Sequence, residues 1–191
     1  RTGTSHIVVL SGYNIAIVAE SIMNALNFLP KNISFGFGAV GIVLFTMLSG
    51  AGASGVRAAI MVLVALFAKR FNRDYKANRV LGMTIVLMLA PNPLLLVFDP
   101  SFQLSVLATI GLIFVSPILE PYFINVTEKF GKFISLREIL STTIATQITV
   151  LPFLIYNTGL LSLISIPVNV LILSTIPLTM FLGFVTGVFG F

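Results

Sequence analysis

The stretch Val56–Arg79, VRAAIMVLVALFAKRFNRDYKANR, joins a long apolar run to a dense cluster of cations. The apolar part predicts a helix over residues 56–71, and the cations form a segment that we call the basic loop, Lys69–Arg79. Five Lys or Arg residues in this loop stand against a single acid, Asp74. Lys and Arg concentrate in the short cytoplasmic loops of membrane proteins. The stretch therefore predicts a membrane helix that ends on the cytoplasmic side.

The composition of the whole chain agrees with this prediction. Of its 191 residues, 57% are hydrophobic and only 9% are charged, against about 25% in an ordinary soluble domain. So few charges cannot cover a water-exposed surface, and disorder requires low hydrophobicity. Because a membrane span takes about 20 apolar residues, the chain has room for six to eight. We expect an all-α polytopic transmembrane helix bundle, a single domain over residues 1–191 cut from a longer protein.

Other apolar runs place the remaining helices. We expect them at residues 7–28, 33–48, 80–90, 99–119 and 136–156, with a last apolar region after Gly159. The helix over residues 99–119 begins with Asp99 as the N-cap and Pro100 as the first helical residue, a favoured arrangement. We expect broken or re-entrant helices at three proline sites, residues 91–93, 152 and 167–169. Such breaks are tolerated at membrane depth where protein or a water-filled cavity receives the freed backbone groups.

The cations also predict an orientation. With the basic loop in the cytoplasm, counting crossings places Lys31, Lys129, Lys132 and Arg137 on the same side. The opposite side receives Arg1, the small-residue stretch over residues 49–55 and Asp99.

Polar side chains inside apolar spans are costly and are therefore the first functional candidates. On the first expected helix, Ser11 and Asn14 lie on one stripe and Glu20 on another. Hydrogen bonding between membrane helices explains such stripes, and so does the lining of a hydrophilic cavity. Both interpretations stay open.

The small-residue stretch 49–55 is followed closely by Arg57. It lacks the Gly-Lys-Ser/Thr ending of a nucleotide-binding loop, and a tight hairpin between packed helices explains its glycines. It does not explain Arg57, since an arginine in the first turn of a helix opposes the macrodipole. We therefore expect an anion beside Arg57. The candidates are Asp99 or Glu20 from this chain, or an external phosphate or carboxylate.

Later helices carry further polar residues. The helices expected at residues 99–119 and 136–156 carry several hydroxyls. Hydroxyls on membrane helices commonly bond to their own backbone, whereas Gln103 and Gln147 are harder to explain in this way. The basic loop also has two interpretations. It is either a topological signal beside anionic lipid or a patch that contacts phosphates at a channel exit.

Together these motifs resemble those of the ComEC competence family, in the same order along nearly the whole chain. The first is Thr2-Gly3-Thr4-Ser5-His6 with Leu10-Ser11-Gly12-Tyr13-Asn14. The later ones are Gly50, Ser54 and Arg57-Ala58; then Asp99-Pro100-Ser101-Phe102-Gln103-Leu104-Ser105 with Ala108; and finally Gln147, Pro152, Tyr156, Gly159 and Pro167-Val168-Asn169. The main departure is Asn14, where the family commonly has histidine.

The resemblance implies a multi-pass channel that passes single-stranded DNA across the bacterial cytoplasmic membrane during natural transformation. Its implied partners are single-stranded DNA, membrane lipids and other competence-machinery proteins, with the pore formed by one copy or by a homodimer. We expect the polar path to use eight residues: Ser11, Asn14, Ser54, Arg57, Gln103, Ser105, Gln147 and Asn169.

We expect no enzyme, cofactor or metal site in this chain. Family members usually add an oligonucleotide-binding-type domain and a metallo-β-lactamase-like domain, and this sequence contains neither. Its zero cysteines and single histidine also leave no ligand set for a metal centre. The alternative function is a secondary transporter for a small anionic or zwitterionic solute, which the broken helices and buried polar residues also fit.

Overall fold

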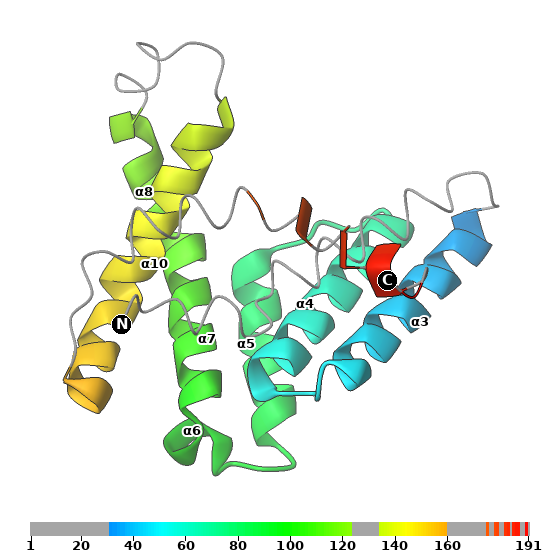
Figure 1. Ribbon diagram of the computed structural model, residues 1–191, viewed down its shortest axis with the longest axis horizontal. Coiled ribbons are helices and arrows are strands. Elements are labelled where there is room, and N and C mark those ends of the chain that lie inside the picture. The colour runs from blue at the N-terminus through cyan, green and yellow to red at the C-terminus, as the bar shows by residue number, and fades with distance from the viewer. Residues whose placement is uncertain are drawn as a thin grey trace. The chain divides into compact units, whose positions relative to one another are not determined.

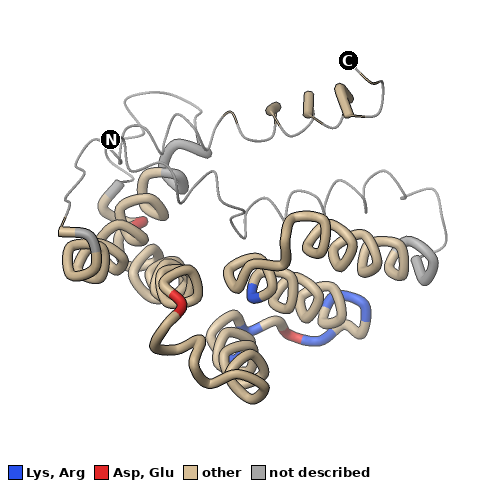
Figure 2. The backbone as a smooth tube through the Cα atoms, turned by 60° about the horizontal axis from the view of Figure 1, so that its bottom comes forward, with Lys and Arg blue, Asp and Glu red and all other residues tan. Residues whose placement is uncertain are grey.

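The computed structural model describes residues 31–123 and 134–159, with a few scattered positions between 175 and 190. Within these ranges every regular element is helical and no strand occurs, as Figure 1 shows. The all-α prediction is confirmed for this part of the chain. The expected first helix over residues 7–28, most of the last apolar region after Gly159 and the proline site at 167–169 lie outside the described residues. Charged residues are few along the described backbone (Figure 2).

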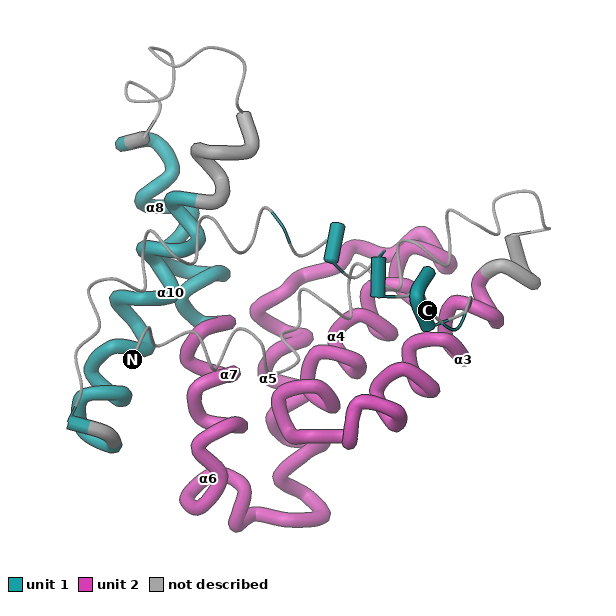
Figure 3. Tube along the Cα trace, viewed as in Figure 1, with its two compact units in different colours: residues 1–7, 110–191 teal, residues 8–109 magenta. Residues whose placement is uncertain are grey.

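The chain forms two compact units, which Figure 3 shows in different colours. Unit 1 comprises residues 1–7 and 110–191, and unit 2 comprises residues 8–109. The prediction of a single domain over residues 1–191 stays a prediction. Each unit is described by itself below.

In unit 2, three helices follow one another closely in sequence and pack in chain order. They are α3 (Lys31–Leu48), α4 (Ala53–Arg70) and α5 (Ala77–Leu89). α3 contacts α4, and α4 contacts α5 (Figure 1). These helices confirm the predictions over residues 33–48, 56–71 and 80–90, with starts two or three residues earlier than the apolar runs.

The turn between α3 and α4 lies within the small-residue stretch. Gly50 has a φ of 87°, in the left-handed region that glycine adopts without a steric penalty. Its N–H donates to the Met47 carbonyl, and the Ala51 N–H donates to the Thr46 carbonyl, both at 3.0 Å. This pair of bonds is a Schellman motif, which satisfies carbonyls at the end of α3. The tight hairpin expected for the stretch is confirmed.

The core of unit 2 lies between α3 and α4. Ile42 from α3 and Ala58 and Ala59 from α4 are almost fully buried, and Phe35 and Phe45 pack against them. The two alanines allow the helix backbones to approach closely, as small residues do in membrane helix pairs. This packing holds the start of α4 firmly in place.

The predicted break at residues 91–93 is confirmed. α5 ends at Leu89, and a single short turn, α6 (Leu95–Phe98), follows the two prolines. α7 (Pro100–Ile110) then begins where the Asp99 cap predicted it. The Asp99 carboxylate oxygen Oδ1 accepts from the N–H groups of Ser101 at 2.8 Å and Phe102 at 3.2 Å. The predicted N-cap is therefore confirmed.

The helix that begins at Pro100 in unit 2 continues along the chain into unit 1 through three further labelled pieces. After α7 come a π-helical turn, η1 (Gly111–Val115), then α8 (Ser116–Leu119) and a 3-10 turn, η2 (Glu120–Phe123). α10 (Ile134–Thr158) packs against η1, α8 and η2. The expected break at Pro152 is wrong, because α10 continues through this proline. A proline inside a helix removes one N–H donor, but prolines are tolerated in membrane helices, where neighbouring groups satisfy the freed carbonyl.

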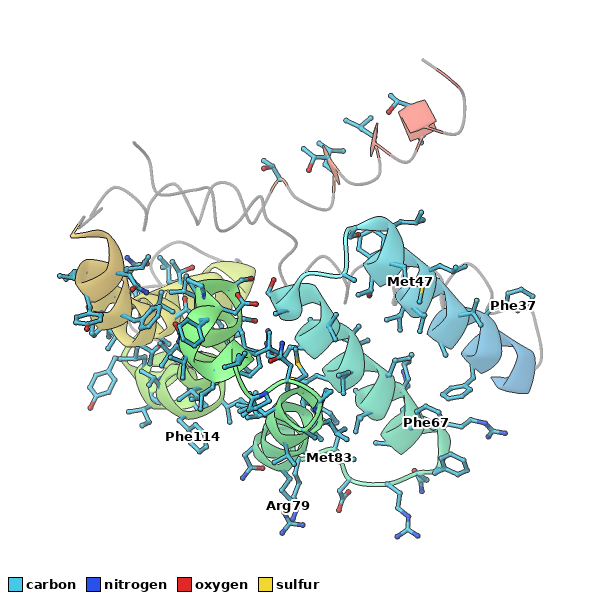
Figure 4. All side chains as sticks on the ribbon, turned by 90° about the horizontal axis from the view of Figure 1, so that it is seen from below. Phe37, Met47, Phe67, Arg79, Met83 and Phe114 are labelled. Atoms are coloured by element: carbon cyan, nitrogen blue, oxygen red, sulfur yellow. The ribbon has the colours of Figure 1, made fainter. Side chains whose placement is uncertain are left out.

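One described helix is long and apolar enough to cross a membrane. It spans Pro100–Tyr122, with a mean hydropathy of 2.0, and only 22% of its most apolar window is buried. The core helix of a soluble protein would be mostly buried. Large apolar side chains are also exposed on the other helices, including Phe37, Met47 and Met83 (Figure 4). The expected count of six to eight membrane segments is not confirmed by the described residues.

Candidate functional site

Arg57 is the central residue of the candidate site. It is the fifth residue of α4, and its side chain is only 7% exposed. The α3–α4 core fixes this part of α4, since Ala58 and Ala59 follow Arg57 directly in sequence. A charged side chain buried to this extent is rare and needs hydrogen-bond partners.

The guanidinium of Arg57 has two partners, and both are neutral. Nε donates to the Ser105 hydroxyl of α7 at 2.6 Å, and Nη1 lies 3.2 Å from the Met61 sulfur. An arginine has five N–H donors, and the described residues offer the remaining ones no further acceptor. As far as the described residues go, Arg57 therefore retains hydrogen-bonding capacity.

No carboxylate neutralises Arg57 within residues 31–123 and 134–159. Asp99, one of the two expected partners, uses its Oδ1 to cap α7 and makes no ion pair with Arg57. Glu20, the other, lies outside the described residues. Within the described residues, the Nε of Arg57 is therefore bonded to the neutral Ser105 hydroxyl and not to Asp99, and an external anion stays one of the predicted partners.

Tyr75, in the connection between α4 and α5, lies within electrostatic range of Arg57. Burial raises the pKa of the Tyr75 phenol above its usual value, and the charge of Arg57 opposes this shift. With a raised pKa the phenol stays neutral at physiological pH. Tyr75 therefore brings no negative charge to Arg57. Sequence reasoning overlooked both Tyr75 and Met61, although the i+4 spacing from Arg57 to Met61 is a usable signal.

Three side chains of the Phe-Gln-Leu-Ser segment of α7, residues 102–105, make different contacts. Phe102 is 1% exposed and anchors the helix. The Gln103 side-chain amide donates to the Leu96 and Val97 carbonyls, which α6 leaves free at its end. Ser105 binds Arg57. The break before α7 and the position of Arg57 therefore depend on neighbouring residues of one helix.

Ser54 lies in the first turn of α4, three residues before Arg57, and is partly buried. Residues three apart lie on the same side of a helix. The structure therefore places Ser54, Arg57 and Ser105 in one region of unit 2. Gln103 shares α7 with Ser105, but its amide nitrogen is already engaged by α6.

Gln147 belongs to α10 in unit 1. It is partly buried and has no hydrogen-bond partner in the described part of the chain. One turn earlier on the same face, the buried Thr143 hydroxyl also lacks a partner. Thr146 and Thr149, in contrast, bond to carbonyls of their own helix, as expected for hydroxyls in membrane helices. Ser11, Asn14 and Asn169 lie outside the described residues.

The described residues contain no group of three or more His, Asp or Glu side chains that could hold a metal ion. The chemistry available at the candidate site is that of a guanidinium and hydroxyls. Such groups bind phosphate or carboxylate oxygens through charge-assisted hydrogen bonds.

Comparison with known proteins gives one curated relative. It is the ComE operon protein 3 of Bacillus subtilis (strain 168), 27% identical over 191 residues that cover 98% of this chain and 23% of the relative. The chain thus spans about a quarter of the length of that protein. No solved structure matches the chain.

The family comparison covers the chain from end to end. The sequence model described as "Competence protein" matches residues 1–191. This match includes the segments that carry Arg57 and Ser105. The chain therefore belongs to the competence protein family.

Proposed function

We propose that the chain is the membrane channel domain that passes single-stranded DNA across the bacterial cytoplasmic membrane in natural transformation. Membership of the competence protein family supports a role in DNA uptake. The observation that carries the finer proposal is Arg57, a buried cation whose contacts in the described residues are all neutral.

A phosphodiester fits the unused capacity of Arg57. The planar guanidinium matches two phosphate oxygens at once, and the contact is strengthened in surroundings of low dielectric constant. A passing strand presents one phosphate after another, so each can replace its predecessor at the same side chain. Neutral partners suit this task, because a carboxylate beside Arg57 would repel the strand and compete for the guanidinium.

The remaining path residues stay proposals. Ser54 and Ser105 lie near Arg57, while Ser11, Asn14, Gln147 and Asn169 complete the proposed path. Gln103 retains only its side-chain oxygen for a strand, because its nitrogen is bound to the end of α6. We assign no catalytic role to this chain, in keeping with its zero cysteines and single histidine.

Placement as a multi-pass protein of the cytoplasmic membrane is part of the same proposal. The apolar helix over residues 100–122 and the exposed apolar side chains support it. Membrane lipids, other competence-machinery proteins and a second copy of the chain are the proposed partners.

Transformation frequency tests the role of Arg57. In the full-length protein we expect Arg57→Met, which keeps a long apolar side chain and removes the charge, to lower the frequency by about 10- to 100-fold. This range corresponds to a lost hydrogen bond to a charged group, roughly 1.5–3 kcal/mol. Arg57→Lys keeps the charge but not the two-point geometry, and should give an intermediate value. Protein levels in the membrane fraction are the control, and normal uptake by Arg57→Met at a normal level would contradict the proposal.

A secondary transporter is the second candidate, favoured by the interrupted segment at residues 90–98. Transporters place such unwound segments at their substrate sites. Purified protein in liposomes separates the two functions. Uptake of a labelled small anion, without uptake of a labelled oligonucleotide, would support the transporter.

A further inference from the structure

The basic loop is held in a defined turn at the end of α4. Asn72 has a φ of 52°, and the Arg73 N–H donates to the Ala68 carbonyl at 2.8 Å. This 6→1 bond is the mark of a Schellman ending, here with asparagine in the left-handed position that glycine usually occupies. The turn fixes where the chain leaves the helix. The cations that follow therefore begin from a fixed point.

The cations of the loop gather around the α4–α5 connection, as Figure 2 shows. Arg73, Lys76 and Arg79 are exposed, and none forms an ion pair within the described residues. Asp74, which lies among them, forms none either. The packing of the described part of unit 2 therefore leaves three cations of this loop available to an external anion.

Apolar rings border these cations. Phe67 and Phe71 at the end of α4 are 48% and 67% exposed, and their rings stack with centroids 6.4 Å apart. The rings of Phe67 and Phe35 of α3 pack edge to face, with centroids 4.9 Å apart. Since α3 also exposes Phe37 and other large apolar side chains (Figure 4), the rings continue an apolar surface up to the cations.

We propose that the basic loop binds anionic phospholipid headgroups, with Arg73, Lys76 and Arg79 contacting the phosphates. Phe67 and Phe71 lie in the acyl region beside them. Clusters of Lys and Arg directly next to membrane helices bind acidic lipids in this manner, and aromatic rings lie at the boundary between acyl chains and headgroups. The inference goes beyond the channel function and does not depend on Arg57.

The apolar surface beside the rings favours lipid over an emerging DNA strand. A single strand needs aromatic faces for its bases and cations for its phosphates, and it would leave the exposed apolar side chains of α3 uncovered. Acyl chains cover Phe67, Phe71 and this surface together, because apolar contact with any part of a side chain removes it from water.

Fluorescence quenching tests the proposal in a direct way. The chain contains no tryptophan, so Phe71→Trp introduces a single reporter at the loop. In nanodiscs with equal mole fractions, we expect brominated phosphatidylglycerol to quench this reporter several-fold more than brominated phosphatidylcholine. Each cation near an anionic surface strengthens binding by roughly fivefold. Replacing Arg73, Lys76 and Arg79 together by alanine should therefore make the two lipids equal.

Two control variants show whether the lipid preference depends on charge and on this particular loop. Arg73→Lys with Arg79→Lys retains the charge, and should retain the preference for phosphatidylglycerol. Lys129→Ala with Lys132→Ala removes two cations from another part of the sequence, and should also leave the preference intact. Circular dichroism checks that each variant remains helical.

Three results would overturn the proposal. The first is equal quenching by both lipids in the parent protein, and the second is a preference that survives the triple alanine variant. The third is a single-stranded oligonucleotide that relieves the lipid quenching and binds the parent but not the triple variant. The last result would assign the loop to the DNA strand instead. None of these three results predicts how Arg57 variants transform. The lipid-binding proposal and the channel proposal can therefore each fail without the other.

Discussion

The contact between Arg57 and Ser105 joins two helices of unit 2 through a single hydrogen bond of 2.6 Å. The donor is a buried cation and the acceptor is a hydroxyl, so the bond also orients the guanidinium. Ser105 is thus a positioning residue for Arg57. Its loss changes both stability and the direction of the charge.

Removal of the Ser105 hydroxyl should lower the stability of the protein. We expect Ser105→Ala to lower the free energy of unfolding by about 1–3 kcal/mol, because the buried Nε–H of Arg57 loses its acceptor. For a domain of this size that corresponds to several degrees in Tm, measured by thermal unfolding in detergent micelles. Ser105→Thr keeps a hydroxyl and should lie close to the wild type. Equal Tm values for the alanine and threonine variants would show that the bond does not contribute.

Removal of the Thr143 hydroxyl, in contrast, should not destabilise the protein. The Thr143 side chain is 3% exposed, and its hydroxyl has no hydrogen-bond partner among the residues that the structure describes. We expect Thr143→Val to leave stability unchanged or raise it by up to about 1 kcal/mol, since valine has a similar shape without the unpaired polar atom.

Thr149→Val is the matched control for Thr143→Val on the same helix. The Thr149 hydroxyl bonds to the Ala145 and Thr146 carbonyls, at 3.1 and 3.0 Å. Its replacement should give no gain in unfolding free energy. A loss of stability or of DNA uptake in Thr143→Val alone would indicate that its hydroxyl has a ligand.

At the scale of elements, Gly111 marks a close approach between η1 and α10 in unit 1. A Cβ on this residue would lie 2.8 Å from the Ala145 carbonyl oxygen and would also clash with the Thr149 hydroxyl. We expect Gly111→Ala to lower the free energy of unfolding by about 1–3 kcal/mol, because η1 and α10 would have to separate. Chemical denaturation of the purified protein measures the change.

Gly82 on α5 provides the control. It is also helical, but nothing lies within 4 Å of an added Cβ. Gly82→Ala should therefore be neutral or stabilise the protein by about 0.5–1 kcal/mol, as alanine favours the helix over glycine. If both variants behave alike, the close contact at Gly111 is not what limits the packing.

Much of the helical order could be predicted from local signals. The apolar runs, the Asp99 cap and the proline pair at residues 91 and 93 are short-range features, and the helices follow them closely. The prediction of a break at Pro152 is wrong, because α10 continues through this proline. The contact of Arg57 with Ser105 could not be predicted, since it joins residues 48 apart and depends on tertiary packing. The sequence indicated that Arg57 needs a partner and could not say which one.

At the scale of the whole molecule, the orientation in the membrane is the main prediction that follows from charge. The chain contains no cysteine, so single cysteines can report on each side. In Asp74→Cys the thiol should react with a membrane-impermeant maleimide only from the cytoplasmic side, because it lies in the basic loop. In Gly52→Cys, on the exposed turn before α4, the thiol should react only from the opposite side.

Labelling of intact cells against inverted vesicles distinguishes the two sides. Reaction of both cysteines from one side would mean that α4 does not cross the membrane. It would leave Arg57 without the apolar surroundings on which the channel proposal relies.

The π-helical turn Gly111–Val115 bears on how the family's sequences should be compared. Such a turn closes its hydrogen bonds over one residue more than an α-helical turn. It therefore amounts to a single-residue insertion that the helix has absorbed without forming a loop. Relatives that keep a regular α-helix here should align with a one-residue gap between positions 111 and 115. Alignments forced to run without that gap would pair the wrong faces of the helix on one side of it.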